Sequence, residues 1–189
     1  MSPLYGTVDV TDDGQVGEYE RTFYQSYAGL TDNKLVRLIW DWDDERRRAR
    51  TKVPYADQVI YSERDAGGKL TGAMAVNLNW PAAFQGQAFG FAVPDRLNGQ
   101  GGPGSRCCEI LNVMLIPQRA ATARESYRRF ISDFGYRDLR AQGFDIAYST
   151  CARRLLRPYQ RLGAQLLGQA AINGEDRYFL CWPLGELVC

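Results

Sequence analysis

Apolar side chains recur at helical spacing near the start of the chain. They lie across residues 15–29, at Val16, Tyr19, Phe23 and Tyr27. Asp12 or Asp13 is placed to cap this helix. A second helix is predicted from residue 31, with apolar positions at Leu35, Leu38, Ile39 and Trp42. It runs into a charge run at residues 41–52, which is typical of a solvated helix face. We therefore expect residues 1–52 to form a helical N-terminal part.

Apolar runs predict a sheet core in residues 53–189. Residues 57–64 and 69–79 flank a turn at 65–68 and are typical of a hairpin. Residues 108–117 form a strand that is apolar on both faces and ends at Pro117. The later elements are predicted as helices at 125–131 and 152–162, and as strands at 144–151, 165–172 and 176–182. This order predicts one α/β domain with a sheet flanked by helices.

Residues 80–106 are a long connection rich in proline, glycine and aromatic residues. A connection of this length inside a domain is often a lid or a binding loop. Its aromatic residues indicate that it covers something apolar.

The charge of the chain is nearly balanced, with a formal net charge of +1 over 189 residues. Such a balance gives no general attraction to nucleic acid or to an anionic membrane, so neither is expected as a partner. The N-terminus has neither a basic start nor an apolar run, and no segment approaches the length of a membrane span. These features favour a soluble cytoplasmic protein.

The sequence contains five cysteines and no histidine. The cysteines have neither the spacing of a zinc site nor the even number of a disulfide framework, so no metal is expected. Cys151 and Cys181 lie in apolar strands and are predicted to be buried. Without histidine, acid–base chemistry must depend on Tyr, Glu, Asp, Cys, a bound water or the substrate.

Two local patterns resemble the GNAT (Gcn5-related N-acetyltransferase) superfamily. Residues 115–117 followed by a basic turn are similar to the V-x-P strand end and the pyrophosphate loop Q/R-x-x-G-x-G/A, with alanine where glycine is expected. Residues 157–163 are similar to the A-x-x-x-Y-x-x-x-G-F ending. The resemblance implies a single domain with a strongly twisted mixed sheet. It also implies a pantetheine thioester co-substrate, held by Leu115, Gln118, Arg119, Ala121, Ala123 and Arg124.

The resemblance implies three catalytic roles. Tyr159 is the general acid for the departing thiolate, and the alternative is a packing tyrosine. The central strand bulges near 112–115 and splays from its neighbour, and the backbone N–H of Leu115 polarises the thioester carbonyl. Glu109 is the base for the amine, and the alternative is an ion pair with Arg106 or another arginine.

The middle of the chain further resembles the autoinducer (acyl-homoserine lactone) synthases and the N-acyl amino acid synthases. Their central strand contains E-x-x-R, whereas this chain has Glu109-x-x-Asn112, and Asn77 lies near the place of another arginine. These differences argue against a homoserine lactone product. The resemblance also implies an acidic acyl carrier protein as a partner. Two basic patches are candidates for docking it, at Arg46, Arg47, Arg48, Arg50 and Lys52, or at Arg119, Arg124, Arg128 and Arg129.

The sequence thus predicts an acyltransferase that moves an acyl group from acyl carrier protein or acyl-CoA to a small-molecule amine, in secondary metabolism or signalling. Two alternatives stay open. One is an acetyl-CoA-dependent acetyltransferase that acts on a small amine or a protein. The other is a GNAT-shaped module that binds a pantetheine thioester or a carrier protein without turnover.

Overall fold

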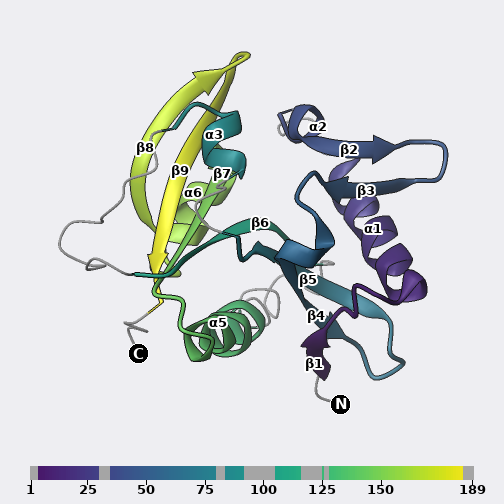
Figure 1. Cartoon of the computed structure of the whole chain (residues 1–189). Helices are drawn as coiled ribbons and strands as arrows, with labels where there is room; N and C mark the ends of the chain where they lie inside the picture. The colour runs from purple at the N-terminus through teal and green to yellow at the C-terminus, as the bar shows by residue number, and fades with distance from the viewer. Residues whose placement is uncertain are drawn as a thin grey trace.

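A mixed seven-stranded sheet in the order β1-β4-β5-β6-β7-β9-β8 forms the centre of the molecule (Figure 1). The computed structural model describes residues 4–29, 35–79, 84–91, 105–115, 125 and 128–184. The strands of this sheet are β1 (Leu4–Thr7), β4 (Gln58–Arg64), β5 (Leu70–Asn77), β6 (Cys107–Leu115), β7 (Ile146–Ala152), β8 (Gln165–Ile172) and β9 (Glu175–Pro183). Among the described strands, only β6 and β7 pair in parallel, which makes the sheet mixed. The expected α/β fold class is confirmed.

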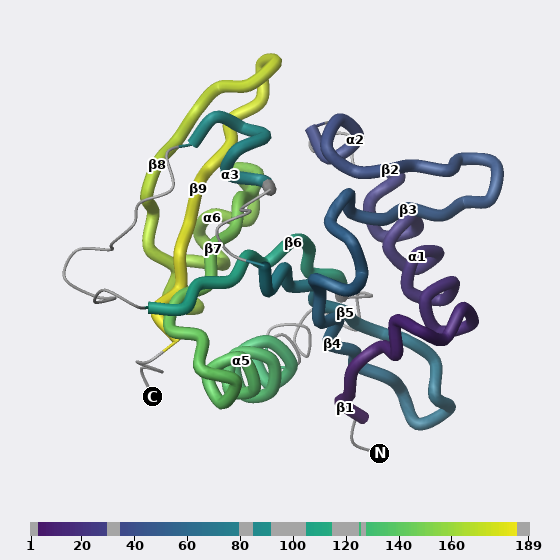
Figure 2. Tube along the Cα trace, viewed as in Figure 1, coloured from purple at the N-terminus to yellow at the C-terminus, as the bar shows by residue number. Residues whose placement is uncertain are grey.

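Helices cover both faces of the sheet (Figure 2). They are α1 (Asp13–Tyr27), α2 (Val36–Ile39), α3 (Phe84–Ala88), α5 (Arg137–Ala141), α6 (Arg153–Gln160), the 3-10 turn η1 (Tyr55–Asp57) and the π-helical η2 (Arg128–Tyr136). Side chains of η2, α5 and α6 share one apolar core with β6, β7 and β9. Those of α1 and α2 pack with β4, β5 and β6 in a second core. The sheet is therefore enclosed where β6 lies.

The first predicted helix is confirmed as α1. The side chain of Asp12 caps it by accepting hydrogen bonds from the backbone N–H groups of Gly14 at 2.8 Å and Gln15 at 3.2 Å. Tyr19 and Phe23 are fully buried. The helix therefore presents its apolar face to the core, as the spacing predicted.

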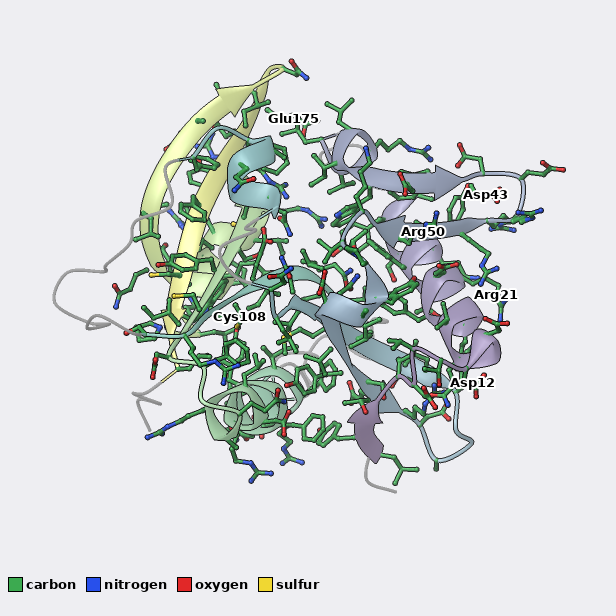
Figure 3. The ribbon with its side chains drawn as sticks, viewed as in Figure 1. Asp12, Arg21, Asp43, Arg50, Cys108 and Glu175 are labelled. Carbon is green, nitrogen blue, oxygen red and sulfur yellow. The ribbon has the colours of Figure 1, made fainter. Side chains whose placement is uncertain are left out.

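The prediction of a helix through the charge run is wrong. After the short α2, residues 40–51 form a hairpin of β2 (Trp40–Asp43) and β3 (Arg48–Thr51). Side chains alternate between faces in a strand, and Asp41 pairs with Arg50 across the hairpin. Figure 3 shows Asp43 and Arg50 on these two strands. The opposite face carries Trp40 and Ala49, both buried. Burial at every second position outweighs the helical tendency of the charged residues, so the expected helical part over residues 1–52 holds only for α1 and α2.

The other predicted strands are present in the structure, and β1 is an additional one. At the turn between β8 and β9, Asn173 and Gly174 have φ values of 51° and 79°. Positive φ at both central positions defines the tight turn that joins twisted strands. Helix α6 ends at Gln160, and Gly163 in the turn that follows has a φ of 89°. Within the 80–106 connection, residues 84–91 and 105–106 are described, and the first of these stretches contains α3.

Candidate active site

The two central parallel strands separate soon after they begin to pair. Strand β6 pairs with β7 only over residues 107–109, within the described part of β6. On its other side, the register with β5 shifts between Ala75 and Val76, so that Leu111 is an extra residue in β6. The splay is confirmed. The bulge lies at Leu111, one residue before the predicted stretch 112–115.

The separation of these strands leaves a narrow cavity of about 30 Å³, which is room for one or two waters. Its lining comes from residues 110–113 of β6, residues 149–152 of β7, Leu155 and Tyr159 of α6, and Tyr27, Val36, Trp40 and Arg177. Side chains of both apolar cores line this cavity. The cavity therefore lies between the two cores.

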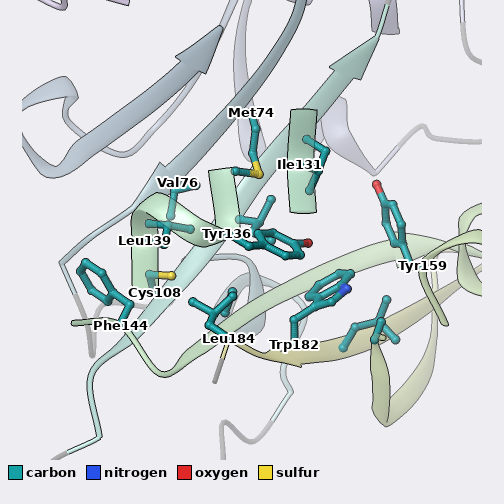
Figure 4. Close-up of a cluster of buried hydrophobic side chains, with 14 of the residues drawn as sticks. Met74, Val76, Cys108, Ile131, Tyr136, Leu139, Phe144, Tyr159, Trp182 and Leu184 are labelled. Atoms are coloured by element: carbon teal, nitrogen blue, oxygen red, sulfur yellow. The ribbon is translucent and has the colours of Figure 1, made fainter. Parts of the chain in front are cut away.

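Tyr159 lies in this cavity on α6, and only 8% of its surface is exposed. Its ring packs edge-on against Trp182 with centroids 5.5 Å apart, and its hydroxyl points away from that indole (Figure 4). The backbone carbonyl of Tyr159 accepts hydrogen bonds from Leu162 and Ala164 at the end of the helix. The ring is therefore a packing residue that also borders the cavity, so the two alternatives for this residue are compatible.

Leu115 is the last residue of β6 and lies opposite Gly72 of β5. The predicted phosphate turn follows it, and its binding residues lie outside the described residues: Gln118, Arg119, Ala121, Ala123 and Arg124. Their roles, and that of the Leu115 backbone N–H, stay predictions.

Glu109 is buried at the point where β6 and β7 part, with 2% of its surface exposed. Its carboxylate accepts hydrogen bonds from the backbone N–H of Gln85 at 2.6 Å and from the side-chain amide of Asn77 at 3.3 Å. Arg106, one of the arginines that the ion-pair alternative offered, donates to the carbonyl of Gln142 at 2.6 Å. Glu109 is not among the described residues that line the cavity. The structure therefore does not bring Glu109 and Tyr159 together there.

Gln85 bridges the separated strands, and the sequence did not point to it. Its side chain donates to the carbonyl oxygens of Ile110 at 3.1 Å and Leu111 at 2.7 Å, and it accepts from the Thr150 hydroxyl at 2.6 Å. Ser149 also donates to the Ile110 carbonyl, at 2.9 Å. Buried carbonyls that lose their strand partner need another donor. Nothing in the sequence of the long connection distinguishes Gln85 from its neighbours.

Arg177 of β9 is a second residue that the sequence analysis missed, and 3% of its surface is exposed. Its Nε donates to the Thr150 hydroxyl at 3.2 Å, and its guanidinium lies 4.9 Å from the centre of the Phe89 ring. Burial lowers the pKa of the guanidinium. A signal was present in the sequence, because Arg177 alternates in phase with the apolar Phe179 and Cys181.

The N-terminal part contributes polar groups to the same cavity. The Tyr27 hydroxyl donates to the carbonyl of Val113 at 3.0 Å, and the Asn112 side-chain amide donates to the Tyr19 hydroxyl at 2.8 Å. Burial raises the pKa of Tyr27 to about 12. The buried Oδ1 of Asn112 has no hydrogen-bond partner within the described ranges. Asn112, which replaces the arginine of E-x-x-R, thus offers an acceptor at this cavity.

Cys151 and Cys181 are buried, as predicted, with 2% and 0% of their surfaces exposed. Burial raises the pKa of Cys151 to about 12, which keeps the thiol neutral. Among the described residues, no group of three or more Asp, Glu, Cys or His could hold a metal ion. In the same part of the chain, no helix combines the length and the apolar character needed to cross a membrane.

No protein-family profile matches the sequence, and no curated protein matches it. Solved structures do match. The AHL synthase LasI superposes with a TM-score of 0.69 at 11% identity, covering 97% of this chain and 90% of that chain. TofI, solved in a ternary complex with an inhibitor and MTA, gives 0.66 at 13% identity, covering 97% and 92%. A GNAT-family acetyltransferase candidate from Desulfovibrio desulfuricans gives 0.59 at 12% identity, covering 97% and 100%.

The chain therefore has the GNAT fold. The resemblance in the sequence, both to the superfamily and to its autoinducer-synthase branch, is confirmed at the level of the fold. The cavity between β6 and β7 is the candidate active site of this chain.

Proposed function

We propose that the protein is an N-acyltransferase that moves an acyl group from a pantetheine thioester to an amine. The observation that carries the proposal is the opening between β6 and β7, which has Tyr159 at its border and the bulge at Leu111 in its wall. An extended ligand would enter where the two strands part, beyond Glu109. A phenol beside that space suits the departure of a thiol.

In the proposed reaction, the amine nitrogen attacks the carbonyl carbon of the thioester. The C–N bond forms and the C–S bond breaks, and Tyr159 gives its proton to the leaving sulfur. The backbone N–H of Leu115 polarises the carbonyl, and the proton lost by the amine returns to Tyr159 through water. Glu109 is the other candidate base. Because it already accepts two hydrogen bonds outside the cavity, it would receive the amine proton only through water.

The donor is proposed to be acyl carrier protein or acyl-CoA, held by its pantetheine arm. In the first candidate patch, three arginines pair with carboxylates: Arg46 with Asp43, Arg48 with Glu20, and Arg50 with Asp41. In the second, Arg128 and Arg129 pair with Glu125. Helix α6 and the residue after it carry exposed arginines at Arg153, Arg154, Arg157 and Arg161, and Arg153 lies 3.9 Å from the carboxylate of Asp176. This face adjoins Tyr159 and supports an acidic donor.

The acceptor is proposed to be a small-molecule amine, and the setting to be secondary metabolism or signalling. The similarity of the fold to the AHL synthase LasI supports this setting.

A donor screen that follows free thiol tests the proposal. Acetyl-CoA, long-chain acyl-CoA and acyl-carrier protein are compared over a panel of amines. We expect amine-dependent thiol release with a long-chain donor. A strong preference for acetyl-CoA would instead favour the acetyltransferase alternative. Donor binding without thiol release over the whole panel would favour the binding module.

A further inference from the structure

Arg177 is the charged side chain among the described residues that line the cavity. Charged groups are costly to remove from water, and an arginine with 3% of its surface exposed is uncommon. A buried charge acts strongly on its surroundings, because the local dielectric is low. The cavity wall therefore carries a positive charge at a place where negative charge would be stabilised.

Hydrogen bonds hold this guanidinium in a fixed orientation. The Thr150 hydroxyl gives its proton to Gln85 Oε1, at 2.6 Å, so its lone pair is free to accept from Arg177 Nε at 3.2 Å. Gln85 is in turn fixed, because its Nε2 donates to the bulge carbonyl of Leu111 at 2.7 Å. Phe89 of the α3 region supports the flat face of the guanidinium. The charge is thus tied to the same bulge that shapes the cavity.

The titratable groups that face Arg177 come from four elements. They are Cys151 of β7, Tyr27 of α1, Tyr159 of α6 and Glu175 of β9. Burial raises the pKa values of Cys151 and Tyr27 to about 12, so both are neutral at physiological pH. Glu175 is half-buried and begins β9 beside the turn, two residues before Arg177. The Cys151 thiol and the Tyr27 phenol therefore place no charge beside Arg177.

We propose that Arg177 is a further catalytic residue, whose fixed positive charge stabilises the negative charge on the sulfur as the thioester is cleaved. Thr150 and Gln85 are positioning residues, because they act through Arg177. The inference rests on the proposed function. When the C–S bond breaks, its electron pair stays on sulfur, and the proton of Tyr159 then neutralises it. Arg177 changes no covalent bond and lowers the energy of the charged stage.

The test is a titration of a bound thiol, and it needs neither an acceptor nor turnover. Coenzyme A and pantetheine 4′-phosphate are bound to the full-length protein, and thiolate absorbance in the ultraviolet is followed against pH. Subtracting the desulfo-coenzyme A complex removes the signal of the protein's own cysteines. Wild type is compared with Arg177→Met, Arg177→Lys and, as a matched control, Arg140→Met, which changes an exposed arginine on α5.

We expect the bound thiol of wild type and Arg140→Met to titrate at least about one pH unit below that of Arg177→Met, since a nearby cation favours the thiolate. Arg177→Lys should keep part of this difference. Thr150→Val, which removes the hydroxyl that orients Arg177, should lose part of it and serves as the test if Arg177→Met does not fold. Identical titrations in wild type and Arg177→Met would overturn the inference alone. If neither probe binds to wild type, the proposed function fails with it.

Discussion

The two edges of β6 are built in different ways. Toward β5, strand β6 is paired from Glu109 to Leu115. Toward β7, pairing covers only residues 107–109, and side chains from distant segments then serve the carbonyls of Ile110 and Leu111. A closed edge needs only its neighbouring strand, whereas an open edge must be completed by specific polar side chains. The open edge is therefore where specific polar side chains lie beside the cavity.

The closed side should show the largest effect on stability. Met74 of β5 is fully buried and lies opposite Val113 of β6. Met74→Ala leaves a cavity in the core and should lower the free energy of unfolding by about 2–5 kcal/mol, measured by urea denaturation. Lys69→Ala, an exposed change in the same hairpin, should stay within about 0.5 kcal/mol of wild type. Equal effects would mean that this side is not tightly packed.

The open side offers a matched pair in α3. Gln85 is 1% exposed, and Gln87 of the same helix is exposed. Gln85→Leu leaves buried carbonyls of β6 short of donors and should cost about 1–3 kcal/mol in the free energy of unfolding. Gln87→Leu should cost almost nothing. If both variants unfold at the same denaturant concentration, Gln85 does not complete the open edge.

A smaller effect on stability is expected at Glu63 of β4, which is not among the described residues that line the cavity. Burial raises the pKa of its carboxyl above the ordinary value of 4.5. The native state thus binds this proton more tightly than the unfolded state does. The stabilisation is fully present below the unfolded pKa and is lost as pH rises through the native one. Glu63→Gln should therefore raise the melting temperature at pH 7, and the gain should shrink toward pH 4. A gain that is independent of pH would contradict this origin.

Much of the fold could be predicted because its patterns are local. The Asp12 cap of α1 and the Asn173-Gly174 turn are set by neighbouring residues. The β2–β3 hairpin was missed because charges dominate its sequence. The period-two burial of Trp40 and Ala49 becomes clear only when the strands pair.

The candidate site could be predicted only in part. Tyr159 was found because it belongs to a short pattern at the end of a helix. The bridge of Gln85, Thr150 and Arg177 joins residues far apart in the sequence, so no local pattern contains it. Such a bridge is fixed by tertiary packing. The sequence nevertheless contained one indication of Arg177, because this charged residue alternates in phase with the apolar Phe179 and Cys181 of the same strand.

Thiol release by Tyr159→Phe tests the central claim most directly. The matched control is Tyr136→Phe, since Tyr136 also packs near Trp182, with ring centroids 6.2 Å apart, and is not among the described residues that line the cavity. With the donor and amine chosen by the screen, Tyr159→Phe should lower kcat by about 100-fold or more. Donor binding should stay within about 2-fold, and Tyr136→Phe should behave as wild type. Undiminished thiol release by Tyr159→Phe would contradict the account.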